Sequence, residues 1–326
     1  SGSAAAVAAG IVPMAVGTET DGSIVCPASL NGVVGIKPTV GSIPTDGVVP
    51  VSASQDTPGS LARTVDDAER MLAVLTDDVS LLSRSALVDV SSLSVGVVDV
   101  WRTGDQATDA LFDEALRYVK ELSQKVSASQ MIATPDEVYT DEFTVLVHEL
   151  RSDLDDYLGA RAGNGAPSSV RDVVDFNRAN ADVELLHFGQ EIFETAAQSQ
   201  GRTASEYVSA RQRNLEWVQN NLDVALQQHN VLIAPAYMPA WKTDFSTGHP
   251  SAGGAVTSPA AIAGLPIVTI PMGLVAGLPV GLSVVGAKNS EALLIALARS
   301  LEKKLGLVND AQWRPRFLRR SSSGHP

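Results

Sequence analysis

The sequence predicts an α/β fold in which helices cover a central β-sheet, and three observations support this. Apolar runs with strand character alternate along the chain with amphipathic helical patterns. Two β-like runs, residues 258–273 and 277–286, flank a connection bounded by Gly273 and Gly277 and predict a hairpin of the sheet. Residues 141–228 change to long polar stretches with many acids and few glycines, which predict a helical insertion beside the sheet.

The first elements are short. Residues 3–9 are rich in alanine and predict a tightly packed helix, with Ser3 as its N-cap and Gly10 as its stop. Residues 11–16 are apolar and predict a buried strand. Residues 31–36 combine glycine with β-branched side chains, and we expect an extended path there.

The later elements follow clearer patterns. Thr64-Val65-Asp66-Asp67 is typical of a capping box, so we expect a helix to begin there. Residues 93–101 predict a strand and residues 107–123 an amphipathic helix. Residues 291–305 carry leucines at helical spacing and predict the closing helix.

Composition excludes several classes of protein. The chain has 326 residues and no uninterrupted apolar run long enough to span a membrane. Its net charge of −13 argues against a nucleic-acid partner, and the arginines near the C-terminus predict a solvated tail. No dinucleotide or phosphate-loop motif is present, and the acid spacing matches no metal site, so we expect neither cofactor nor metal.

Residues 17–27, G-T-E-T-D-G-S-I-V-C-P, are the stretch that indicates chemistry. A nucleophilic serine needs a base within hydrogen-bond reach and backbone donors for the developing oxyanion. Ser23 follows the turn-prone Thr20-Asp21-Gly22, and Gly22 permits a sharp bend. A Gly-Ser pair alone is usually a surface turn, so the neighbouring sequence must indicate whether Ser23 is catalytic. The lone cysteine, Cys26, is interpreted as a small packing residue.

Those neighbouring sequences resemble the signature of the amidase signature family of serine hydrolases. The resemblance rests on S-G-S-A-A-A-V-A-A-G at residues 1–10, on the G-T-E-T-D-G-S-I stretch continued as P-A-S-L-N-G-V-V-G-I-K-P-T, and on S-Q-D-T-P-G at residues 54–59. The wording is most similar to bacterial peptide amidases. The resemblance implies a mixed central sheet covered by helices, in one domain over residues 1–326 with the insertion at 141–228.

The resemblance also implies the roles of the site residues. Ser23 would be the nucleophile, and the backbone N–H groups of Thr20, Asp21, Gly22 and Ser23 would form the oxyanion hole. The family's catalytic lysine and cis-serine would precede residue 1, so we expect an N-terminally truncated chain that is inactive by itself. Ala234-Pro235-Ala236 matches a family strand end, which makes Tyr237 and Trp241 candidates for the substrate pocket.

The implied activity is hydrolysis of a peptide C-terminal carboxamide or a small primary amide, with release of ammonia. Two alternatives stay open: the glutaminase subunit of an amidotransferase, and an inactive remnant that serves as an interaction module. Val25 stands where many relatives have arginine, which counts against glutaminase partnering. Lys37 matches a non-catalytic element of the signature. Spacing alone leaves a Ser–His–Asp triad open. We expect a cytoplasmic enzyme with no membrane partner, and leave a homodimer open.

Overall fold

The computed structural model describes residues 1–161, 163, 165–244, 246 and 255–307. The arginines at positions 314, 316, 319 and 320, with His249 and His325, lie outside this range, so their predicted roles stay untested. No helix among the described residues is long and apolar enough to cross a membrane.

The described residues form one mixed sheet of eight strands. Its order is β1-β3-β2-β7-β8-β6-β4-β5, in which β4 runs parallel to β5 and β6 and the other pairs are antiparallel. The strand bounds are β1 Met14–Glu19, β2 Val34–Lys37, β3 Thr57–Ala62, β4 Ser94–Val97, β5 Lys125–Ala128, β6 Val231–Pro235, β7 Ile267–Val275 and β8 Leu278–Gly286. The predicted mixed α/β fold is confirmed.

Helices cover both faces of the sheet, because its central strands are apolar on both sides. Along β6, Val231 and Ile233 pack into one core cluster, whereas Leu232 and Ala234 pack into the other. The first face carries the helices α3 Val65–Leu75, α4 Ser80–Ala86, α5 Gln106–Leu122 and α13 Glu291–Leu305. The second face carries α2 Val25–Asn31, α10 Ser205–Val218, α11 Val224–Gln228 and α12 Thr257–Ala263. The helix α1 Gly2–Ala8 packs beside α2.

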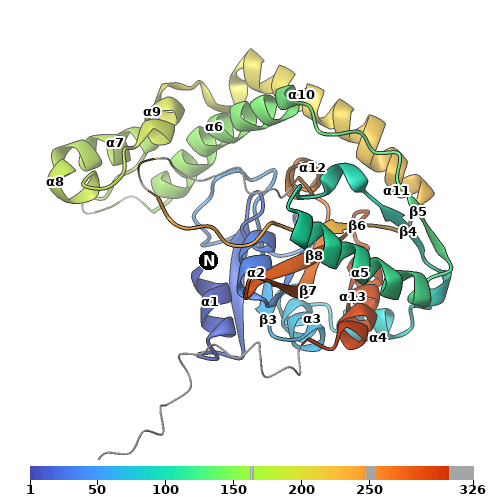
Figure 1. Cartoon of the computed structure of the whole chain (residues 1–326). Coiled ribbons are helices and arrows are strands. Elements are labelled where there is room, and N and C mark those ends of the chain that lie inside the picture. Colours follow the sequence, from blue (N-terminus) through green and yellow to red (C-terminus); the bar gives the residue numbers. More distant parts are fainter. Residues whose placement is uncertain (162, 164, 245, 247–254, 308–326) are drawn as a thin grey trace, which may run out of the picture.

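A helical segment arches over the second face (Figure 1). It runs from α6 Asp136–Gly159 through α7 Val170–Ala179, α8 Ala181–Glu184 and α9 Glu191–Gln198 to α10 and α11. Part of it has an apolar cluster of its own, made by Val147, Leu150, Leu154, Val170 and Ala196. This helical content agrees with the pattern of residues 141–228, although the segment begins at Asp136. Its description as an insertion stays a prediction.

Several element predictions are confirmed. The side chain of Thr64 accepts the Asp67 N–H at 3.1 Å and caps α3, as the capping pattern predicts. The helix predicted at 107–123 is α5, and the closing helix α13 has the predicted bounds. Strands β7 and β8 form the predicted hairpin, with both turn residues, Ala276 and Gly277, at positive φ.

Other predictions are wrong. The helix α1 begins before Ser3, whose hydroxyl instead donates to Val16 O at 2.8 Å. The strand predicted at 11–16 begins at Met14, and it is not buried, because β1 pairs only with β3 within the described sheet. Residues 258–263 belong to α12, and Gly264 follows as its left-handed C-cap. A short apolar run suits a helix as well as the predicted strand. The strand predicted at 93–101 is shorter in the structure, where β4 spans only Ser94–Val97.

Candidate active site

Ser23 lies in the short loop between β1 and α2. It is exposed, whereas the following residue, Ile24, is fully buried. The loop turns at Gly22, which has φ of +79°. A Cβ at this position would lie 2.6 Å from the hydroxyl oxygen of Tyr237. The bend and the close approach of Tyr237 therefore both require glycine, and they leave Ser23 at the surface of the loop.

Glu19, the last residue of β1, anchors the end of this loop that leads into α2. Its Oε2 accepts the N–H groups of Ile24 at 2.6 Å and Val25 at 2.9 Å, so one carboxylate satisfies the first turn of α2. Gly22 O also accepts the Cys26 N–H at 2.7 Å. Burial raises the pKa of Glu19, and the nearby Lys37 opposes that shift. The loop is thus anchored immediately after the serine.

The four N–H groups predicted to hold the oxyanion are free of protein acceptors. Within the described part of the chain, the amides of Thr20, Asp21, Gly22 and Ser23 donate no hydrogen bond. Backbone donors without an internal partner are uncommon and suit an anionic or carbonyl oxygen of a ligand. The geometry therefore leaves this loop able to bind a substrate carbonyl, although its role as an oxyanion hole is untested.

Two buried carboxyl groups lie together at the loop, that of Asp21 within it and that of Glu142 from α6. Ser258 Oγ of α12 donates to Asp21 Oδ2 at 2.5 Å, and Glu142 of α6 accepts from Gln55 Nε2 at 2.9 Å. Burial, followed by the negative charge of Asp21, raises the pKa of Glu142 to about 8. Burial likewise raises the pKa of Asp21. Burial and the neighbouring Asp21 therefore both favour the protonated form of Glu142.

Other nucleophiles and bases in the sequence are engaged elsewhere. The fully buried Lys37 donates through Nζ to Leu265 O at 2.7 Å and to Pro38 O at 3.2 Å, and burial lowers its pKa to about 8. Burial raises the pKa of the Cys26 thiol to about 11, which keeps it protonated. His148 contacts Gly201 O and Glu206, and His229 contacts Ala225 O and Ser127.

The hydroxyl of Ser23 has no hydrogen-bond partner among the described residues. None of these lysine, cysteine or histidine side chains contacts it through a described hydrogen bond. The structure thus brings Ser23 and its backbone donors together, but it does not place a base beside them.

The two pocket candidates differ in what the structure shows. Tyr237 follows β6 and lies against Gly22, as its contact distance shows, so it borders the loop of Ser23. Trp241 is half-buried further along the same segment. Its role in a pocket stays a prediction.

Sequence patterns missed several residues around the site, namely Glu19, Gln55, Asp56, Glu142 and Ser258. Glu19 is the last residue of β1, Asp56 directly precedes β3, and both stand inside the stretches that carry the resemblance. An acid at the end of a strand was therefore an available signal. Glu142 and Ser258 come from α6 and α12, far from Ser23 in the chain. No local pattern indicates that they meet Asp21.

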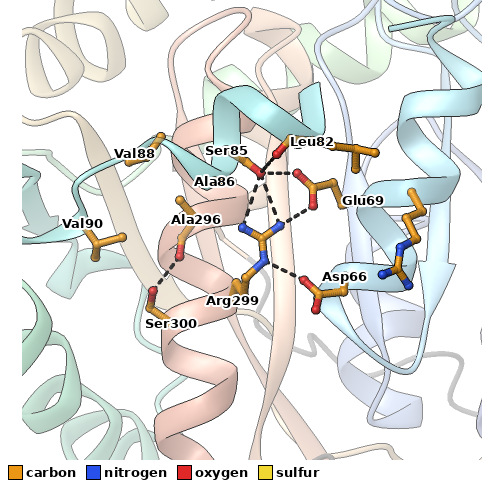
Figure 2. A pocket seen from close by; sticks show the side chains of 11 residues that line it. Asp66, Glu69, Leu82, Ser85, Ala86, Val88, Val90, Ala296, Arg299 and Ser300 are labelled. Atoms are coloured by element: carbon orange, nitrogen blue, oxygen red, sulfur yellow. Dashed lines mark hydrogen bonds and ion pairs between the residues drawn. The ribbon is translucent and has the colours of Figure 1, made fainter. Parts of the chain in front are cut away.

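A cavity of about 500 Å³ lies on the opposite face of the sheet, between α3, α4 and α13. Figure 2 shows that Arg299 occupies its wall, with its guanidinium bonded to Asp66, Glu69 and Ser85. Two carboxylates already compensate Arg299, and Arg70, the other arginine of the lining, pairs with Asp67 at 3.1 Å. We interpret the arrangement as an ionic link between helices.

Comparisons with known proteins show which family the chain resembles. A family model described as Amidase matches residues 1–295. A glutamyl-tRNA(Gln) amidotransferase subunit from Exiguobacterium sibiricum is 31% identical, over 94% of this chain and 67% of its own length. Mandelamide hydrolase of Pseudomonas putida is 30% identical, over 94% of this chain and 61% of its own length.

Among solved structures, the native peptide amidase from Stenotrophomonas maltophilia superimposes with a TM-score of 0.83. It is 33% identical, and the match covers 94% of this chain and 65% of that one. The chain therefore spans about three fifths to two thirds of these relatives.

Proposed function

Because the chain belongs to the amidase family, we propose that it carries the nucleophile and oxyanion loop of an enzyme that hydrolyses amides. The observation that supports this most strongly is the loop itself. Ser23 is exposed and lies between a strand and a helix that are joined by the hydrogen bonds of Glu19. The backbone N–H groups of residues 20–23 donate no hydrogen bond among the described residues. Such a loop binds a carbonyl oxygen beside a hydroxyl.

The proposed reaction is acyl transfer. Ser23 Oγ attacks the carbonyl carbon of the amide, and its proton passes through a serine to the leaving nitrogen. The C–N bond breaks, ammonia leaves, and water then hydrolyses the ester on Ser23. We propose that a cis-serine and a lysine relay this proton, as the family resemblance implies. Among the described residues, no side chain makes a hydrogen bond to the Ser23 hydroxyl. We propose that residues 1–326 alone hydrolyse amides poorly.

The substrate class proposed is a C-terminal carboxamide of a peptide or a small primary amide. The similarity to a peptide amidase and to a mandelamide hydrolase supports this class. Tyr237, and by proposal Trp241, would line the pocket for the acyl part of the substrate.

A glutaminase subunit of an amidotransferase is the second candidate, favoured by the relatives that bear that name. Position 25 weighs against it. Val25 is fully buried in the core, so it presents no charged side chain beside the nucleophile. Glutamine hydrolysis that depends on a copurifying subunit would favour this second candidate.

The test is the Ser23→Ala variant of the full-length protein as the gene encodes it. We expect ammonia release from a peptide carboxamide to fall by about 10³-fold or more, because a nucleophile has no substitute in this mechanism. Cys26→Ala is the matched control, since it removes the thiol that lies three residues after Ser23, and it should retain activity. Unchanged hydrolysis in Ser23→Ala would refute the proposal.

A further inference from the structure

Residues 51–56 form a loop that lies between the loop of Ser23 and the helix α6. The register of the sheet places them there. Strand β3 begins at Thr57, which pairs with Glu19 at the end of β1. The next residues on the two chains, Asp56 and Thr20, therefore face one another where the strand pair opens into the two loops.

Thr20 is held from this side through both its side chain and its carbonyl. Its hydroxyl donates to Asp56 Oδ1 at 2.5 Å, and its carbonyl oxygen accepts Gln55 Nε2 at 3.4 Å. These contacts leave the Thr20 N–H free. Because a peptide group is planar, fixing the carbonyl of Thr20 also fixes the direction of the Asp21 N–H. The bond from the Thr20 hydroxyl to Asp56 fixes the position of the residue itself.

Asp56 is itself rigidly placed. Its second oxygen, Oδ2, accepts the N–H groups of Val51 at 2.8 Å and Ser52 at 2.9 Å. Its own N–H donates to Ser52 O at 2.7 Å. One carboxylate thus closes the 51–56 loop with one oxygen and holds Thr20 with the other.

The other side of the 51–56 loop is bound to carboxylates of α6. Glu149, which is 1% exposed, accepts Ser52 Oγ at 2.5 Å and the Ser54 N–H at 3.2 Å. Asp153 accepts the Ala53 N–H at 2.7 Å. Glu142 accepts Gln55 Nε2. Tyr207 of α10 in turn donates to Glu149 at 2.7 Å, so α6 and α10 together support this loop.

We propose that residues 51–56 are a positioning element of the active site, in which Asp56 sets the orientation of Thr20 and therefore the aim of the oxyanion donors. This inference rests on the proposed function of Ser23. Asp56 does not touch the substrate in this account. It acts through Thr20, and α6 acts through residues 51–56.

The test is a double-mutant cycle in the full-length, gene-encoded protein. Thr20→Val removes the hydroxyl at nearly constant shape and keeps the backbone N–H. Asp56→Ala removes the acceptor. Each should lower kcat for a peptide carboxamide by roughly 10- to 100-fold with little change in KM, because a small misplacement of a catalytic donor costs this much. The double variant should be no slower than Asp56→Ala, since the two residues act as one unit.

The chain offers a matched control in Thr103 and Asp109. Thr103 Oγ1 donates to Asp109 Oδ1 at 3.0 Å, and Asp109 also accepts the N–H groups of Thr103 and Gly104. Thr103→Val removes the same kind of bond in the loop before α5, together with the acceptor of the Asp105 N–H at 3.2 Å. It should leave kcat unchanged, and thermal unfolding of both threonine variants should show a similar small loss of stability.

The outcomes separate this inference from the proposed function. A wild type without amidase activity, or an active Ser23→Ala, overturns both. A wild type whose activity depends on Ser23, combined with a Thr20→Val variant of wild-type kcat, overturns the positioning role alone. Multiplicative effects of the two substitutions would also overturn it. If Asp56→Ala fails to fold, Thr20→Val and its control decide the matter.

Discussion

At the residue scale, Gly22 determines the shape of the loop. Two separate effects meet there, a φ of +79° and a contact of 2.6 Å between a new Cβ and the Tyr237 hydroxyl. Gly41 has φ of +86° with nothing within 4 Å of its Cβ position, so it isolates the backbone effect.

We expect Gly22→Ala to lower the free energy of unfolding by more than Gly41→Ala, for which the backbone cost is about 1–2 kcal/mol. Adding Tyr237→Phe to Gly22→Ala should recover part of the difference, since it removes the clashing oxygen. Urea denaturation of the variants measures this. Equal losses of unfolding free energy for Gly22→Ala and Gly41→Ala would show that the Tyr237 hydroxyl does not clash with a Cβ at position 22.

At the element scale, α6 joins the helical segment to the loops of the site through buried carboxyl groups. The side chain of Glu142 faces Gln55, Asp21 and Ser258, and its pKa is raised to about 8 against an ordinary value of 4.5. As pH rises from 4.5 toward 8, the unfolded chain releases this proton while the folded chain keeps it. The free energy of unfolding therefore falls across that window.

Glu142→Gln removes this loss and keeps an amide oxygen to accept from Gln55. We expect the Tm of the variant to match that of the wild type near pH 5 and to exceed it by a few degrees at about pH 8 to 9. Glu137→Gln, an exposed position on the same helix, is the control and should leave the pH dependence unchanged. A wild type and a Glu142→Gln variant with parallel Tm curves would contradict the raised pKa.

Elements with a capping residue or a strong period were predictable. The capping pattern at Thr64 and the leucine period of α13 depend on local contacts, and both predictions are confirmed. Two features were not predictable, namely the partial exposure of β1 and the helical conformation of residues 258–263. A short apolar run suits a strand or a helix, buried or not, until its neighbours are known. The exposure of β1 follows from its position at the edge of the sheet, and the helix at 257–263 follows from the packing of α12 on the second face.

At the scale of the whole molecule, the sheet brings three distant segments to one place. The loop of Ser23, residues 51–56 and the helical segment meet at the end of β1 and β3. The motif around Ser23 predicted its own loop from sequence, because its turn is local. The support from Asp56, Glu142 and Ser258 was not predictable, because it depends on strand register and on helices far along the chain.

The central claim, that Ser23 is the nucleophile, is tested most directly by covalent labelling. The full-length, gene-encoded protein is treated with a fluorophosphonate, digested and analysed by mass spectrometry. The account predicts one phosphonylated peptide with the adduct on Ser23, formed more slowly in Thr20→Val. An active enzyme labelled at another residue, or one that hydrolyses amides while Ser23 stays unmodified at saturating reagent, would contradict it.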